Sequence, residues 1–299
     1  MRDQNSTQPL VGTLTVEAAL NQAHDRCERI DQRMLLAHAM ARPIAWLLAH
    51  PEALLSEQEN QLYSEHLERR QNGEPIAYLI GEREFHGLSF EVTPAVLIPR
   101  PETELLVDQL LEAFPAGVSG RVVDLGTGSG VIAVTLACRR PLLDIVAVDR
   151  DEAALEVAIR NAERMGVRKK IEFRLGRWFS NLREEQFDAV VSNPPYIAAQ
   201  DQHLSEGDLR FEPKGALVGG PDGLLDLAAI IDLSPSHLSL GGLLALEHGY
   251  DQAGVVRRLM EMAGFVNVQS ALDIAGIERV TAGRYRVDRS ETPGYARGT

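Results

Sequence analysis

The sequence predicts an α/β protein whose main domain contains a doubly wound, mostly parallel sheet. Strands alternate with helices from about residue 121, a glycine-rich loop follows the first of these strands, and a polar segment ends the fourth. Such alternation builds parallel sheets with helices on both faces. A chain of 299 residues has room for this domain and a smaller one.

The region before the sheet has the apolar spacing of helices. Between about residues 15 and 70, apolar side chains recur with nearly helical periodicity. Ser56 and Glu59 form a capping-box pattern, which predicts a helix that runs toward residue 70. Asn72-Gly73 and Pro75 then end this helix. We therefore expect a small helical bundle over residues 1–84.

A short linker is expected between the two domains. Residues 88–92 alternate between apolar and polar side chains, as a strand does. Pro94 and Pro99 interrupt the segment that follows. Residues 85–101 are therefore predicted to form a β-hairpin linker.

The main domain is expected over residues 102–285, and it begins with a helix from Glu102 to about Phe114. The predicted strands are Arg121–Leu125, Asp144–Val148, Ile171–Leu175, Phe187–Ser192 and Gly242–Glu247, with Phe265–Leu272 and Glu278–Tyr285 as a closing pair. The predicted helices between them are Val131–Cys138, Glu152–Met165 and Leu224–Leu233. Together these strands predict a seven-stranded, mostly parallel sheet. Residues 286–299 are polar, and we expect a flexible tail there.

Composition excludes some classes of protein. The net charge of −13 argues against nucleic-acid binding driven by overall charge. Cys27 and Cys138 have no metal-ligand spacing, so we expect neither a metal site nor a disulfide framework. The N-terminal residues 1–9 lack the apolar core of a signal peptide, and no apolar run approaches the roughly 20 residues that span a bilayer. We expect a cytoplasmic protein.

The glycine-rich loop is Gly126-Thr127-Gly128-Ser129-Gly130, between the first strand and its helix. Glycines let the backbone turn tightly and approach a ligand closely. Asp124 precedes the loop, where a carboxylate disfavours a pyrophosphate but suits a cation or a hydrogen-bond donor. Asp149 ends the second strand, where a carboxylate can bind ribose hydroxyls. These features suggest an adenosine cofactor without a diphosphate, such as S-adenosylmethionine; the alternatives are a tight turn and a helix cap.

The fourth strand ends in Asn193-Pro194-Pro195-Tyr196. Proline has no backbone donor, so strand pairing stops there and nearby carbonyl groups become free. The Asn oxygen and a carbonyl oxygen are two acceptors, and the Tyr ring is a flat face. This set suits a planar group with two N–H donors, such as an amide or an exocyclic amine; the alternative is a structural strand terminator.

These motifs resemble class I S-adenosylmethionine-dependent methyltransferases, which have a Rossmann-like sheet. More narrowly, the chain resembles the bacterial protein-(glutamine-N5) methyltransferases that modify peptide chain release factors. The resemblance extends from the helical N-terminal region to about Tyr285. Its further motifs are Gly73–Tyr78, Leu97–Glu104, Asp208–Pro213, Gly242–Gly249 and Glu278–Tyr285.

The resemblance implies a role for each site residue. Gly126, Thr127, Gly128, Ser129 and Gly130 would hold the methionine moiety, Asp149 the ribose, and Trp178 the adenine. Asn193 would contact both the cofactor's surroundings and the substrate. Asn193, Pro194, Pro195 and Tyr196 would hold the glutamine, with Asn193, Pro194 and Tyr196 as the catalytic residues. The chain departs from the family at Arg177, where an acidic residue is usual.

The resemblance favours release factors as the protein substrate. We further expect a monomer in which the N-terminal helices and linker dock that substrate. A sister group that methylates a large-subunit ribosomal protein tends to have Arg-His-Glu-Pro, whereas this chain has Arg210-Phe211-Glu212-Pro213. Adenine N6 presents the same planar NH2, so a DNA methyltransferase is a rival, although the acidic composition counts against stable nucleic-acid binding. A non-catalytic cofactor-binding module is a further rival, and it predicts the loss of one of the two motifs, both of which are intact.

Overall fold

The computed structural model describes residues 14–23 and 26–286. The described residues form two compact units, with the division between Gly81 and Glu82. The predicted flexible tail lies, except for its first residue, outside the described residues. No helix in the described part of the chain has the length and apolar character needed to cross a bilayer.

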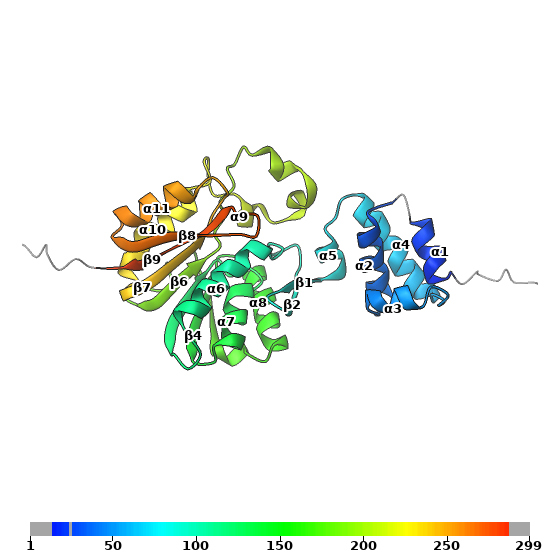
Figure 1. Ribbon diagram of the computed structural model, residues 1–299, viewed down its shortest axis with the longest axis horizontal. Helices are drawn as coiled ribbons and strands as arrows, with labels where there is room; N and C mark the ends of the chain where they lie inside the picture. Colours follow the sequence, from blue (N-terminus) through cyan, green and yellow to red (C-terminus); the bar gives the residue numbers. More distant parts are fainter. Residues whose placement is uncertain (1–13, 24–25, 287–299) are drawn as a thin grey trace, which may run out of the picture. The chain divides into compact units, whose positions relative to one another are not determined.

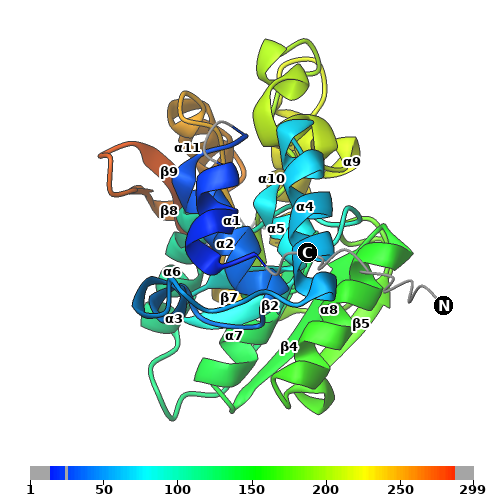
Figure 2. The same cartoon turned by 90° about the vertical axis from the view of Figure 1, so that its right-hand side faces the viewer.

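The N-terminal unit is a bundle of short helices. They are α1 (Val16–Gln22), α2 (Arg29–Ala39), α3 (Ile44–Ala49), α4 (Glu57–Gln71) and α5 (Ile76–Ile80). Helices α2 and α4 lie side by side in both ribbon views (Figures 1 and 2). The capping box that the sequence predicts is present, because the Ser56 hydroxyl accepts from Glu59 N and the Glu59 carboxylate accepts from Ser56 N.

The larger unit contains the predicted seven-stranded sheet, in the order β5-β4-β3-β6-β7-β9-β8. Its strands are β3 (Gly120–Leu125), β4 (Leu143–Asp149), β5 (Ile171–Leu175), β6 (Phe187–Ser192), β7 (Leu238–Glu247), β8 (Phe265–Leu272) and β9 (Glu278–Tyr285). Strands β3 to β7 are parallel, and β9 pairs antiparallel with both β7 and β8. Strand β7 begins earlier than predicted, because Leu238 pairs with Phe187 before a register shift.

Helices cover both faces of the sheet, as the alternation predicts. Helices α6 (Glu104–Ala113), α7 (Val131–Arg139) and α8 (Glu152–Arg164) cover one face, and α10 (Leu225–Leu233) and α11 (Ala253–Met262) cover the other (Figure 1). Five short helices, η1 (Pro101–Thr103), η3 (Gln202–Ser205), η4 (Gly207–Phe211), α9 (Lys214–Leu217) and η5 (Ser234–Ser236), occupy connections, and η2 (Arg168–Lys170) precedes β5. Alternate residues of each central strand, such as Val122 and Val123, enter opposite cores.

The hairpin is formed by β1 (Glu82–Phe85) and β2 (Leu88–Glu91). Its first strand begins three residues before the predicted linker. The pattern does not predict these residues, because they are exposed and show no apolar alternation. Asn161 of α8 holds β2, since its Oδ1 accepts from Glu91 N at 2.7 Å and its Nδ2 donates to Glu91 O at 3.0 Å. The same Nδ2 donates to Ser129 O, which links the hairpin to the glycine loop.

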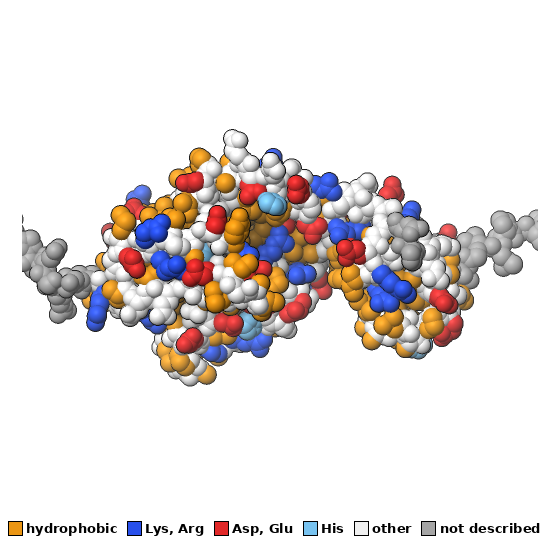
Figure 3. All heavy atoms as spheres, turned by 45° about the horizontal axis from the view of Figure 1, so that its top comes forward, with side chains coloured by type: hydrophobic (Ala, Val, Ile, Leu, Met, Phe, Trp, Pro, Cys, Tyr) orange, Lys and Arg blue, Asp and Glu red, His pale blue; other side chains and the backbone are white. Residues whose placement is uncertain are grey.

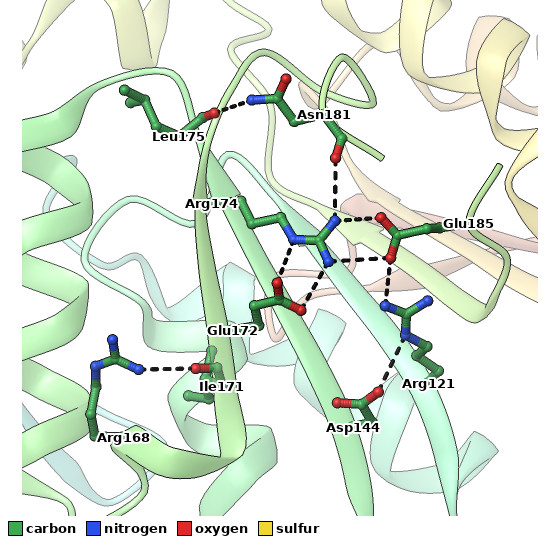
Figure 4. A network of polar contacts seen from close by, with 9 residues as sticks. All are labelled: Arg121, Asp144, Arg168, Ile171, Glu172, Arg174, Leu175, Asn181 and Glu185. Carbon is green, nitrogen blue, oxygen red and sulfur yellow. Dashed lines mark hydrogen bonds and ion pairs between the residues drawn. The ribbon is translucent and has the colours of Figure 1, made fainter. Parts of the chain in front are cut away.

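An ionic network joins the edge strand β5 to the sheet (Figure 4). Arg174 of β5 donates to Glu172 at 2.9 Å and also to Glu185, which precedes β6. Glu185 accepts in addition from Arg121 of β3 at 2.5 Å, and Arg121 pairs with Asp144 of β4. The hydrogen bond from Arg174 holds the pKa of Glu185 below its usual range. Charged side chains also protect an edge strand from pairing with another chain.

Candidate active site

A cavity of about 440 Å³ lies where β3, β4, β5 and β6 end, within the larger unit. Such crevices at the carboxyl ends of parallel strands are the ligand sites of open α/β sheets. The structure brings these predicted site residues together in its lining: Gly126, Thr127, Gly128, Ser129, Asp149, Trp178, Asn193 and Pro195. Three other predicted residues, Gly130, Pro194 and Tyr196, are not part of this lining, although each is next to a residue that is.

The glycine loop has the backbone that its sequence requires. Gly126, Gly128 and Gly130 all have positive φ, at 73°, 56° and 83°, a region that disfavours side chains. A Cβ on Gly128 would meet no atom within 4 Å, which leaves room for a ligand beside the backbone. A Cβ on Gly130 would lie 3.0 Å from the Cβ of Ala158. Gly130 therefore serves the packing of α7 against α8, whereas Gly128 serves the cavity.

Asp149 both lines the cavity and supports the loop. Its Oδ2 accepts from Gly128 N at 2.9 Å, and its Oδ1 accepts from Asp151 N at 3.0 Å. Burial raises its pKa, and these backbone donors oppose that rise. The carboxylate is therefore held in place at the end of β4, where the sequence predicts a ribose ligand.

Asp124 has a different position from the one that the sequence suggests. It is fully buried and does not line the cavity. Its Oδ2 accepts from Thr127 Oγ1 at 2.7 Å and from Ala133 N at 3.2 Å. Burial raises its pKa to about 7. Asp124 thus supports the loop from beneath instead of meeting a ligand.

Trp178 lies at the cavity in a strained backbone conformation. Its φ is 50°, which is unusual for a bulky residue, and such strain is often found at functional sites. Its Nε1 donates to the buried Asp226 Oδ1 at 3.3 Å, which fixes the indole. Arg177 also donates to Asp226, at 3.0 Å, so the residue that departs from the family pattern is neutralised by a carboxylate of α10.

The polar segment after β6 belongs to a chain of hydrogen bonds. Asn193 Nδ2 donates to Thr103 Oγ1 at 3.0 Å, and Thr103 Oγ1 donates to Glu247 Oε2 at 2.7 Å. Tyr196 Oη donates to the other oxygen of Glu247, at 3.0 Å. Glu247 ends β7 with only 1% of its surface exposed, and burial raises its pKa to about 7.

Sequence reasoning did not identify Thr103 or Glu247 as site residues. A signal was present for both, because each lies in a motif quoted for the family resemblance. Glu247 also ends an apolar run, so it occupies the same sheet edge as Asn193 and Asp149. Acidic residues at such strand ends are candidates for a site.

Glu212 joins two segments beside the cavity. Its carboxylate accepts from Ile98 N at 3.0 Å and from the Arg100 guanidinium. Leu97 and Pro99, which alternate with these two residues, line the cavity, as does Pro213. The Arg-Phe-Glu-Pro stretch therefore fixes one wall of the cavity.

His248 follows Glu247 but is not positioned as a general base. It is fully buried, with Nδ1 hydrogen-bonded to Gly249 O and Nε2 to Thr281 Oγ1. Burial lowers its pKa. Both ring nitrogens are used within the fold, which supports the structural role predicted for a histidine at this strand end.

Comparison with known proteins assigns the family. Residues 101–209 match the family model "Methyltransferase small domain", and residues 15–81 match "PrmC N-terminal domain". A release factor glutamine methyltransferase from Xylella fastidiosa is 46% identical over 89% of this chain and 97% of its own length. The chain belongs to the release factor glutamine methyltransferase family. Similar relatives include proteins of that name from Salmonella typhimurium, 47% identical over 89% of this chain and 96% of theirs, and Escherichia coli, 46% identical over 86% and 92%.

Solved structures agree on the fold. A methyltransferase from Pyrococcus furiosus has a TM-score of 0.52 and 20% identity, over 75% of this chain and all of its own. A Thermus thermophilus 16S rRNA methyltransferase, solved with AdoMet and guanosine, has a TM-score of 0.51 and 22% identity, over 69% of this chain and 50% of its own. Both support the methyltransferase fold that the sequence predicts, and family membership confirms the predicted methyltransferase activity.

Proposed function

We propose that this protein transfers a methyl group from S-adenosylmethionine to the side-chain amide nitrogen of a glutamine in peptide chain release factors. The observation that carries the proposal is that Asn193 lines the same cavity as the glycine loop and Asp149. An amide acceptor thus stands beside a site suited to an adenosine cofactor. The names of relatives up to 47% identical support the release factor as substrate.

The cavity fits the cofactor. Gly128 leaves open space beside a backbone that can approach the methionine moiety, and Asp149 offers carboxylate oxygens to the ribose. The buried ring of Trp178 offers an apolar surface for the adenine. When bound, the cofactor supplies an electrophilic methyl group.

The residues after β6 are proposed to orient the glutamine amide. An amide nitrogen is a poor nucleophile, because its lone pair is delocalised into the carbonyl. The Asn193 Oδ1 and the Pro194 carbonyl would accept its two N–H groups, and these hydrogen bonds strengthen as positive charge develops on nitrogen. Pro195 and the Tyr196 ring would complete the holding site around the amide plane. No basic side chain is required, since the proton can leave to water afterwards.

We further propose that the protein acts as a monomer in the cytoplasm, where release factors work. Stable nucleic-acid binding is not expected at a net charge of −13. On the face drawn in Figure 3, basic and acidic side chains are interspersed, an arrangement that gives little attraction to a phosphate backbone.

The test is a competition among three substrates. The protein is incubated with labelled methyl donor and a purified release factor, a large-subunit ribosomal protein, or DNA, and the product is mapped by mass spectrometry. We expect one methyl group on a glutamine of the release factor. Label on the ribosomal protein or on adenine N6 alone would replace the proposal with that rival, and label on none would support the non-catalytic alternative.

A further inference from the structure

While Glu247 is ionised, the hydrogen bonds that link Asn193 to Glu247 through Thr103 have only one consistent direction. An ionised carboxylate can only accept hydrogen bonds, so the Thr103 hydroxyl must donate its single proton to Glu247 Oε2, at 2.7 Å. The Thr103 oxygen then has only lone pairs left for Asn193, at 3.0 Å. Asn193 must therefore present its NH2 to Thr103, and its Oδ1 takes the opposite side of the amide.

We propose that Glu247 is a positioning residue that, through the hydroxyl of Thr103, fixes the Asn193 amide with Oδ1 available to accept an N–H of the substrate glutamine. The inference rests on the proposed function for the identity of that substrate. With the amide reversed, Asn193 would present NH2 to the NH2 of the glutamine, and two donors repel each other. We call the hydrogen bonds from Asn193 through Thr103 to Glu247 the relay. Its direction decides whether Asn193 assists the reaction or opposes it.

The second oxygen of Glu247 controls the other end of the same segment. Tyr196 Oη donates to Oε1 at 3.0 Å, which ties the Tyr side chain to Glu247. One carboxylate therefore fixes both the first and the last residue of Asn193-Pro194-Pro195-Tyr196. It comes from β7, the strand next to β6 in the sheet, so the support is rigid.

Protonation of Glu247 would remove the fixed direction, because a neutral carboxyl can donate to Thr103 and release the Thr103 proton toward Asn193. The pKa of Glu247 is raised to about 7, chiefly by burial and to a smaller extent by the charge of Glu102. The hydroxyl donors Thr103 and Tyr196 lower the pKa, as does the charge of Arg279. The relay is therefore complete above this pKa and is lost as pH falls below it.

A pair of Thr103 variants tests the relay. Thr103→Val keeps the shape but removes the hydroxyl, and kcat should fall roughly 10- to 100-fold, the equivalent of one hydrogen bond to a developing charge. Thr103→Ser restores the hydroxyl and should restore most of kcat. Cofactor affinity, measured by calorimetry, should change less than about threefold in either variant, which shows that the fold and the cavity persist.

Glu247→Gln tests the pH dependence. Glutamine offers one acceptor oxygen to two hydroxyl donors and does not titrate near neutral pH. The kcat of the wild type should rise with pH through the Glu247 pKa, whereas the kcat of the variant should stay low and flat. A wild-type kcat retained by Thr103→Val, or a pH profile shared by wild type and Glu247→Gln, would refute the relay while leaving the proposed function intact.

A measurement without substrate separates the two proposals. The side-chain NH2 signals of Asn193, assigned by their loss in Asn193→Asp, are followed by nitrogen-15 NMR across pH 5–9. They should shift together with the Glu247 titration and should lose that transition in Thr103→Val. If wild type methylates no release factor, the proposed function fails but the titration still decides the relay. Asn193 signals that ignore the Glu247 titration would overturn it.

Discussion

The two glycines of the cofactor loop should respond differently to the same methyl group. Gly128→Ala places a side chain at a φ of 56° but in open space, so it should cost about 1–2 kcal/mol of unfolding free energy from backbone strain alone. Gly130→Ala has the same kind of strain at 83°, and its Cβ would also lie 3.0 Å from the Cβ and 3.2 Å from the Cα of Ala158. Overpacking adds about 1–3 kcal/mol, which gives about 2–5 kcal/mol in total.

Urea denaturation of a Trp46→Phe background provides the assay. The chain has two tryptophans, so Trp178 then reports only on the larger unit, which contains both glycines. Linear extrapolation at constant slope gives the change in unfolding free energy. Cofactor affinity, measured by calorimetry, should fall more in Gly128→Ala than in Gly130→Ala, because Gly128 lines the cavity and Gly130 does not.

Equal stability of the two variants would refute the role proposed for Ala158. If Gly130→Ala is as stable as Gly128→Ala, α8 can move away from the new methyl group at no cost. The contact with Ala158 would then not be the reason for a glycine at position 130. The double variant Gly130→Ala with Ala158→Gly provides the control, since it removes the contacting methyl group and should recover part of the loss, provided that the intrinsic cost of glycine in a helix is subtracted.

Three further outcomes are expected. Asn193→Ala removes one of the two acceptors proposed to hold the glutamine amide, so kcat should fall at least 100-fold. Cofactor affinity, measured by calorimetry, should largely persist. Near-normal methylation would contradict the mechanism. The pKa of Glu247 rises on folding from 4.5 to about 7, so the stability of the wild type is lost as pH rises through that window. Between pH 4.5 and 8, the unfolding free energy of the wild type should therefore fall by about 3 kcal/mol relative to that of Glu247→Gln. Arg174→Met should lower the unfolding free energy of the larger unit by about 1–2 kcal/mol in 0.1 M salt and by less in 1 M salt. If this loss is the same at both salt concentrations, the charges of the network add little to stability.

Most of the sheet could be predicted, because its strands carry local signals. Strands β5, β6, β8 and β9 have the predicted bounds, since each is an apolar or alternating run between turn residues. Strand β7 was predicted too short because Gly241, at a φ of 79°, interrupts its pattern. Helix α11 was not predicted, although Val256 and Met260 have helical spacing and are buried. The signal was present in the sequence, because Val256, Leu259 and Met260 recur with helical spacing and join the same core as Phe265 of β8.

Part of the candidate site could also be predicted from the sequence. Gly126–Gly130, Asp149 and Asn193 could be predicted to meet, because topology alone brings the ends of β3, β4 and β6 to one edge. The partners that hold them could not be predicted. Thr103 is separated from Asn193 by 90 positions in the sequence and from Glu247 by 144. Such pairs depend on the exact placement of helices on the sheet. Periodicity contains no information about that placement.

Glu247 shows why stability alone does not explain this site. An ionised carboxylate that is almost fully buried destabilises the fold near neutral pH, and a neutral glutamine of the same shape would fold with less penalty. Glutamine, however, has an NH2 donor in place of one of the two oxygens that accept from Thr103 and Tyr196. If Glu247→Gln is the more stable protein at pH 8 and also the slower enzyme, the charge serves the orientation of Asn193 and Tyr196. The same substitution then separates the requirements of folding from those of catalysis in one side chain.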